Sequence, residues 1–143
     1  KENAAAIIAG ISVGTLVSLG SALALAVAMD LTREQYVTLL PKSVTTAISM
    51  DVAAELGGIA ALTGAIVILT GIAGNLLAET VCKVFHITDP IAKGVGIGTS
   101  AHAVGTSKAL QMGEVEGAMS GLSIAVAGVL TAVLCPIFVN FIG

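Results

Sequence analysis

Charged side chains are scarce in this sequence. Only 10% of its 143 residues are Asp, Glu, Lys or Arg, whereas a soluble domain averages roughly a quarter. So few charges do not cover a globular surface in water, and the mean hydropathy of +1.03 favours lipid as the solvent. The net charge is −3 and no basic run occurs, so nucleic acid is not an expected partner. The composition predicts a protein embedded in the lipid bilayer.

The motifs of common enzyme classes are also missing. No HExxH or P-loop sequence occurs, no GxSxG frame surrounds Ser100 or His102, and "GVGIG" is too short for a dinucleotide-binding loop. The two cysteines, Cys82 and Cys135, lie within apolar runs without metal-ligand spacing, and we expect buried, inert thiols. We therefore expect no enzyme activity, no catalytic residues, no cofactor and no metal site.

Three apolar stretches are long enough to cross a bilayer, which takes about 20 residues. Residues 4–29 and 117–142 carry no charge, and the stretch 57–85 carries charges only near its end. The first stretch is too long for the apolar part of a signal peptide. We expect an all-α, polytopic transmembrane helical bundle, one domain over residues 1–143, that passes several times through the inner (plasma) membrane of the cell.

Small residues recur at every fourth position in two of these stretches. This spacing lets membrane helices approach each other closely. The stripes are Gly10, Gly14, Ser18, Ala22 and Ala26 in the first stretch, and Gly117, Gly121 and Ala125 in the last.

Two further segments, 30–56 and 86–116, are moderately apolar and interrupted in the middle. In the first, Pro41 lacks an amide proton and clashes with the preceding turn, so a helix must break or kink there. In the second, three alternating glycines each cost roughly 1 kcal/mol in a helix, which predicts a break within residues 94–98. Two such breaks indicate two pairs of half-helices or two re-entrant hairpins, with the breaks facing the protein interior.

A weak internal repeat relates the halves of the chain. The strings that begin at Val44 and Val104 share five identities in 22 positions, and Lys42 then aligns with His102. The first unit would comprise residues 1–85 and the second residues 86–143. Repeats with interrupted helices at matching places are typical of secondary transporters, in which half-helix N-termini face anionic substrate groups near the midplane.

The basic flanks predict an orientation in the membrane. Lys1 and the pair Lys83 and Lys93 place the N-terminus and the 83–93 loop together in the cytoplasm by the positive-inside rule. The segment 30–56 would then enter and leave the membrane on the outer side, as a hairpin.

Polar side chains beside the two interruptions are candidates for substrate binding. Hydroxyls and free amides at helix N-termini suit a carboxylate, a lysine in a membrane segment is costly and often functional, and a histidine binds an anion or relays a proton. Structural explanations stay open, because hydroxyls also cap helices, lysines snorkel to the surface and a lone histidine often only donates a structural hydrogen bond. The candidates are Lys42, Ser43, Thr45 and Thr46 at the first interruption, and Thr99, Ser100, His102, Thr106 and Lys108 at the second.

Acidic side chains near the interruptions have two interpretations. Asp51 and Glu55 lie one helical turn apart and either receive Na⁺ or H⁺ in ion coupling or form a solvated helix end. Glu114 and Glu116 are expected in a hydrated turn, and His86 is expected as a plain interface residue.

Three sequence blocks resemble the LrgB/CidB family of membrane proteins. They are "PKSVTT" at residues 41–46, "GTSAHAVGT" at 98–106 and "EVEGAMS" at 114–120, and they occur in the order and spacing of that family. Members usually have proline where this chain has Ala47, which leaves the local helix start open. Members are also typically longer, so the resemblance implies that this chain corresponds to their C-terminal part.

The resemblance implies two kinds of function. One is secondary transport of small monocarboxylates of the pyruvate, glycolate and glycerate class. The paired interruptions favour this carrier, with the carboxylate held near Thr45, Thr46, Thr106 and His102. The other is an antiholin-like regulator of murein hydrolase export and autolysis. It would act with a small membrane partner of the LrgA/CidA type, in a homo- or hetero-oligomer, through the small-residue faces.

Overall fold

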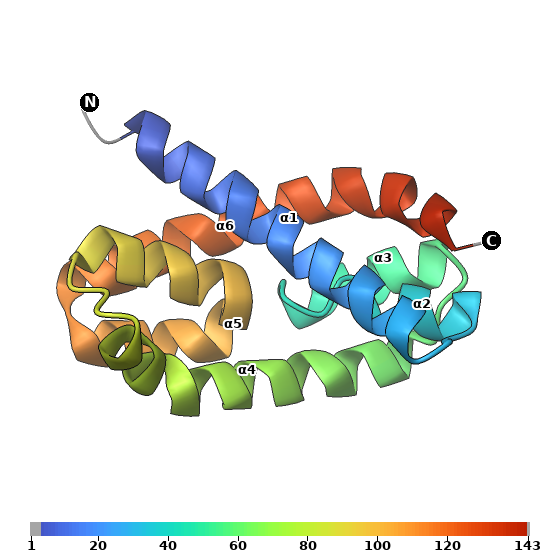
Figure 1. Ribbon diagram of the computed structural model, residues 1–143, viewed down its shortest axis with the longest axis horizontal. Coiled ribbons are helices and arrows are strands. Elements are labelled where there is room, and N and C mark those ends of the chain that lie inside the picture. The colour runs from blue at the N-terminus through green and yellow to red at the C-terminus, as the bar shows by residue number, and fades with distance from the viewer. Residues whose placement is uncertain (1–3, 143) are drawn as a thin grey trace.

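The computed structural model describes residues 4–142, and Lys1 lies outside them. This part of the chain is all-helical, as predicted (Figure 1). Three helices are long and apolar enough to cross a membrane, namely α1, α4, and α6 with its short extension. The elements are α1 (Ala4–Ala28), α2 (Arg33–Leu39), α3 (Thr46–Glu55), α4 (Ala60–Val84), α5 (Pro90–Met112), α6 (Glu114–Phe138) and the 3₁₀ turn η1 (Val139–Phe141).

The three predicted spans are confirmed, but two of them begin at different residues. Helix α4 begins only at Ala60, because Gly57 turns the chain with a φ of +89° after α3. Helix α6 begins at Glu114 rather than residue 117. The expected hydrated turn at Glu114 and Glu116 is therefore wrong: both residues lie in the first turn of α6, and Glu116 is buried.

The segment 30–56 forms a re-entrant helical hairpin around Pro41. Helix α2 stops before the proline, residues 40–45 form the tip, and α3 returns. The open end of this hairpin lies beside the C-terminus of α6, because the Tyr36 hydroxyl donates to the Phe138 carbonyl at 2.9 Å. Thr63, near the start of α4, also donates to the Thr38 carbonyl at 2.9 Å. The predicted interruption at Pro41 is confirmed.

Helix α5 is a second hairpin, which reverses at His102. That residue has a φ of 42° and a ψ of −142°, outside the helical region. It separates an N limb (residues 90–101) from a C limb (residues 103–112), which lie side by side (Figure 1). The limbs are so close that a Cβ atom on Gly105 would lie 3.0 Å from Ile97 Cγ2.

The break predicted within residues 94–98 is wrong, because the N limb is helical through all three glycines. Two of them pack against α6: a Cβ atom on Gly94 or Gly98 would lie 2.5 Å from the carbonyl oxygen of Glu116 or Ser120, respectively. Backbone-to-backbone packing therefore offsets the roughly 1 kcal/mol that each glycine costs in a helix. The interruption instead falls at His102, the residue that the repeat aligns with Lys42.

The two hairpins enter the bundle from opposite ends. The second opens where α1 begins, since Ala6 and Ile7 face Asp89 and Ile91 across one groove. We call this the α4–α5 end. The first turns of α1 and the start of α5 thus lie at the same end of the bundle. The predicted cytoplasmic location of the N-terminus and of the 83–93 loop stays a prediction, since Lys1 lies outside the described residues. Each hairpin follows one long helix and precedes another, as the repeat predicted, and the unit boundary after residue 85 also stays a prediction.

The small-residue stripe of α1 packs inside the chain. Ala22 and Ala26 are buried, a Cβ atom on Gly14 would lie 2.7 Å from Thr99 Oγ1, and the Ser18 hydroxyl donates to Ser43 Oγ at 2.7 Å. In α6, by contrast, the stripe is only partly covered, because Gly121 and Ala125 are exposed. The stripe of α1 thus joins this helix to the tip of the first hairpin and to the N limb.

We expect Ala47→Pro to leave stability unchanged or to raise it. Ala47 is exposed in the first turn of α3. The backbone amide there has no acceptor within the helix, so a proline at this position removes no helical hydrogen bond. The matched control is Ala54→Pro, exposed near the other end of α3, which should cost about 3 kcal/mol because its amide lies in the helical ladder. Thermal unfolding in detergent compares them. An equal loss in both variants would contradict this account of the helix start.

Candidate functional site

A polar cavity of about 250 Å³ lies where the two hairpins meet α1. The tip of the first hairpin supplies a lysine and a serine, the N limb of α5 supplies two hydroxyls, and the middle of α1 supplies two serines. The cavity is lined by Gly14, Val17, Ser18, Ser21, Lys42, Ser43, Thr99 and Ser100. Residues from three distant parts of the sequence thus surround one small space.

Of residues 4–142, Lys42 is the only cation in the lining of this cavity. Its Nζ donates to Ser43 Oγ at 3.2 Å, and the Ser18 hydroxyl donates to the same oxygen at 2.7 Å. Within residues 4–142 no carboxylate forms an ion pair with Lys42, whereas Lys83, Lys93 and Lys108 each pair with a glutamate. The half-buried ammonium group of Lys42 is therefore available to an anion from outside the chain.

Lys42 and Ser43 are the cavity residues whose hydrogen-bond donors remain free. The hydroxyls of Thr99, Ser100 and Ser21 donate to backbone carbonyls of their own helices, at 2.9, 2.6 and 2.7 Å. Ser43 Oγ accepts twice and keeps its own proton for another acceptor. An oxyanion in the cavity would accept hydrogen bonds from the ammonium group and from this hydroxyl.

Four of the predicted substrate-binding residues line the cavity, namely Lys42, Ser43, Thr99 and Ser100. Ser18 and Ser21 of α1 are cavity residues that the sequence did not identify. Ser18 stands in the small-residue stripe, and the spacing indicated helix packing without showing what the hydroxyl would face.

His102 and Thr106 hold the second hairpin in place and do not line the cavity. The His102 ring is buried, and its Nε2 lies 2.7 Å from the Val67 carbonyl oxygen on α4. Thr106 donates to the His102 carbonyl at 3.0 Å and lies 2.7 Å from Ser120 Oγ of α6. Both side chains thus satisfy or surround the backbone of the reversal.

Lys108 and Asn75 tie the C limb to α4. The Lys108 ammonium lies 2.7 Å from a Glu79 carboxylate oxygen, so the charge is already paired. Asn75 Nδ2 donates to the Val104 carbonyl at 2.8 Å and to Ser107 Oγ at 3.0 Å. Nothing in the sequence indicated a role for Asn75, because the carbonyl that it binds lies 29 residues away, just after the helix reversal.

The remaining candidates lie on α3. Thr45 is the N-cap residue but its side chain does not cap the helix, and Thr46 packs near Gly64 of α4. Asp51 and Glu55 are exposed and do not line the cavity. Their role in ion coupling stays a prediction.

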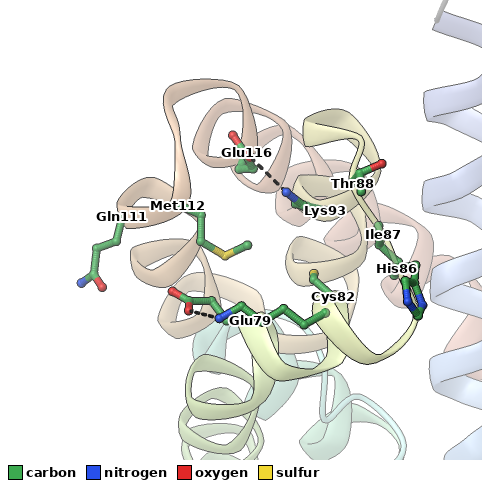
Figure 2. Close-up of a pocket in the computed structure, with 10 residues that line it drawn as sticks. Glu79, Cys82, His86, Ile87, Thr88, Lys93, Gln111, Met112 and Glu116 are labelled. Atoms are coloured by element: carbon green, nitrogen blue, oxygen red, sulfur yellow. Dashed lines mark ion pairs between the residues drawn. The ribbon is translucent and has the colours of Figure 1, made fainter.

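A larger cavity, of about 550 Å³, lies at the α4–α5 end (Figure 2). Figure 2 shows two ion pairs in its lining, one between Lys93 and Glu116 and one at Glu79, whose partner is Lys83 on the same helix. His86, expected as a plain interface residue, also lines this cavity, and so does the buried Cys82. Cys135 is buried too, so the expected burial of both thiols is confirmed.

Three span-length apolar helices and two opposed hairpins define a helical membrane protein. The family model of the LrgB-like family matches residues 1–141, nearly the whole chain. The protein therefore belongs to the LrgB-like family, as the three sequence blocks predicted. No solved structure matches the chain.

We expect His102→Ala to lower the stability of the protein by about 2–3 kcal/mol, because it removes a buried hydrogen bond and leaves a void beside α4. The matched control is His86→Ala, at the other histidine with positive φ, which is exposed and ends α4. Thermal unfolding in detergent measures both. A smaller loss at His102 than at His86 would show that the ring does not hold the hairpin.

Proposed function

We propose that this protein carries small monocarboxylates of the pyruvate, glycolate and glycerate class across the inner membrane, with the carboxylate bound at Lys42. One observation carries the proposal: the half-buried ammonium group of Lys42 lies at the junction of two opposed hairpins. No carboxylate of residues 4–142 forms an ion pair with it.

The electrostatics of the cavity favour an anionic substrate. An isolated charge away from bulk water is unfavourable unless it is paired. A bound carboxylate supplies the missing partner and accepts hydrogen bonds from Lys42 and Ser43. The volume of about 250 Å³ is below the range of roughly 300–1,000 Å³ typical of drug-sized ligands. The cavity therefore suits an acid of a few carbon atoms.

The arrangement of the hairpins supports transport rather than binding alone. Secondary transporters place their substrate between interrupted helices near the bilayer midplane and move one repeat against the other around it. Here the tip residues 40–45 come from one end of the bundle and the N limb comes from the other. A substrate at Lys42 touches both hairpins, so a relative movement of the hairpins would expose it to one side or the other.

This location differs from the one that the sequence suggested. The sequence favoured a carboxylate near Thr45, Thr46, Thr106 and His102, because free amides occur at half-helix N-termini. His102 and Thr106 are occupied by hydrogen bonds within the protein. The start of α3 remains close in sequence to Lys42, and its positive dipole end adds to the attraction for an anion.

We expect Lys42→Gln to weaken carboxylate binding and uptake by about tenfold to a hundredfold, since a hydrogen bond to a charged group contributes about 1.5–3 kcal/mol. Uptake of labelled pyruvate, lactate, glycolate and glycerate into liposomes and equilibrium binding in detergent measure the effect. The control is Arg33→Gln, an exposed cation outside the cavity. A folded Lys42→Gln protein with full uptake would contradict the proposed site.

A second candidate function is the antiholin-like regulation of murein hydrolase export through a small LrgA/CidA-type membrane partner. The exposed Gly121 and Ala125 on α6 favour it, because they form a small-residue face that another helix can approach. The α1 stripe is already used within the chain.

A variant of α6 distinguishes the regulator from the carrier. A side chain at Gly121 meets nothing within 4 Å, so Gly121→Leu should leave the fold intact. For a regulator, we expect this variant to reduce co-purification with the small partner while Lys42→Gln does not. For a carrier alone, uptake by Gly121→Leu stays at the wild-type level.

A further inference from the structure

Three cavities adjoin one another between the α4–α5 end and Lys42. The cavity of Figure 2, called the vestibule below, shares Cys82, Ile87 and Lys93 with an apolar cavity of about 350 Å³ between α4 and the N limb. This second cavity, called the passage, shares Ser100 with the Lys42 cavity. The shared lining residues thus place the three cavities one after another between the end of the bundle and Lys42.

Small side chains of the N limb keep the passage open. Ala92, Gly96 and Ser100 follow one another at four-residue intervals, are all exposed, and all line the passage. A Cβ atom on Gly96 would meet nothing within 4 Å. The opposite wall consists of α4 residues such as Leu77 and Val81. Lys93 and Ile97 are the larger N-limb side chains in the lining, and the other N-limb positions leave space for a small molecule.

Two lysines stand at the entrance to this route. Lys83, His86 and Lys93 line the vestibule together with Glu79 and Glu116. Lys93 also lines the passage, and its distance of 3.9 Å to Glu116 is the longest of the three ion pairs described. This loosely paired ammonium group can interact with an anion as it leaves the vestibule for the passage.

We propose that the carried anion reaches Lys42 from the α4–α5 end, through the vestibule and then the passage, with Lys93 as an intermediate contact. The proposal rests on the proposed function, because it assumes an anion site at Lys42. It assigns an access route, and a second and transient anion contact, to residues outside the Lys42 cavity.

A competing groove on the other side of the N limb is less suited to an anion. It has a volume of about 510 Å³, lies between α1 and the N limb, and shares Gly14 and Thr99 with the Lys42 cavity. Among the described residues, its only charged lining side chain is Asp89, a carboxylate near the start of α5. A carboxylate there repels an approaching anion, whereas in the vestibule the charges of Glu79 and Glu116 are balanced by Lys83 and Lys93.

The two native cysteines provide a matched test of the route. Cys82 lines both the vestibule and the passage, whereas Cys135 is buried in the core with Tyr36 and Leu19. We expect N-ethylmaleimide to reduce uptake at least tenfold in the Cys135→Ala protein, which keeps Cys82. The Cys82→Ala protein should retain its uptake under the same treatment. Mass spectrometry measures the labelling, and Cys82 that is labelled without loss of uptake, or not labelled at all, overturns the route.

Two neighbouring leucines of α4 provide a second test that involves no chemical modification. Leu77 lines the passage, and Leu76 is exposed beside it but lines no part of the route. We expect Leu77→Trp to slow uptake severalfold without a change in the equilibrium dissociation constant in detergent, since the indole narrows the passage and leaves Lys42 untouched. Leu76→Trp should behave as the wild type. Equal uptake in both variants would count against the passage.

The outcomes separate the route from the carrier function. If the unmodified protein neither binds nor takes up any of the four acids, the proposed function itself fails. If wild-type uptake depends on Lys42 but is unaffected by Cys82 labelling and by Leu77→Trp, only the route fails, and the groove along α1 becomes the path to test.

Discussion

The bilayer interior contains no water to satisfy backbone polar groups, and this constraint governs the two hairpins. A chain that reverses at membrane depth leaves amides and carbonyls without helical partners, so the protein has to supply them. At the first tip, Ser49 Oγ lies 2.7 Å from the Pro41 carbonyl oxygen and 3.3 Å from that of Val44. At the second, His102 bonds to the backbone of α4 and Asn75 donates to the Val104 carbonyl. Polar side chains thus complete the backbone at these reversals or tie it to a neighbouring helix.

The same constraint identifies the candidate site. Once the side chains that complete the backbone are set aside, the polar groups that remain between the tips are few. Lys108 is paired with Glu79, and the hydroxyls of Thr99 and Ser100 donate to their own helix. In the lining of the cavity, the ammonium of Lys42 and the hydroxyl proton of Ser43 are left. By residue type alone, all these polar side chains are equal candidates for substrate binding. Their hydrogen bonds distinguish the side chains that stabilise the fold from those that are free to bind a ligand.

Close packing brings the tips together. Glycines in the N limb let its backbone approach α6, and Gly14 lets α1 approach Thr99. The cavity at Lys42 is therefore bordered by α1 and the N limb, while the passage lies between this limb and α4. The small residues therefore have two effects, which are tight contact where they face a neighbouring backbone and open space where they do not.

The sequence by itself determined the three spans and the first interruption. Long uncharged runs indicate spans regardless of what packs around them, and Pro41 breaks a helix because its own chemistry removes an amide proton. The internal repeat also indicated that the polar candidate residues lie near two helix interruptions. Only the tertiary structure decided that α5 reverses at His102 rather than at its glycines, since helical packing against α6 outweighs their local cost. It also decided that Ser18 and Ser21 face Lys42 while Thr106 and Lys108 do not, because which side chains meet depends on contacts between helices far apart in the chain.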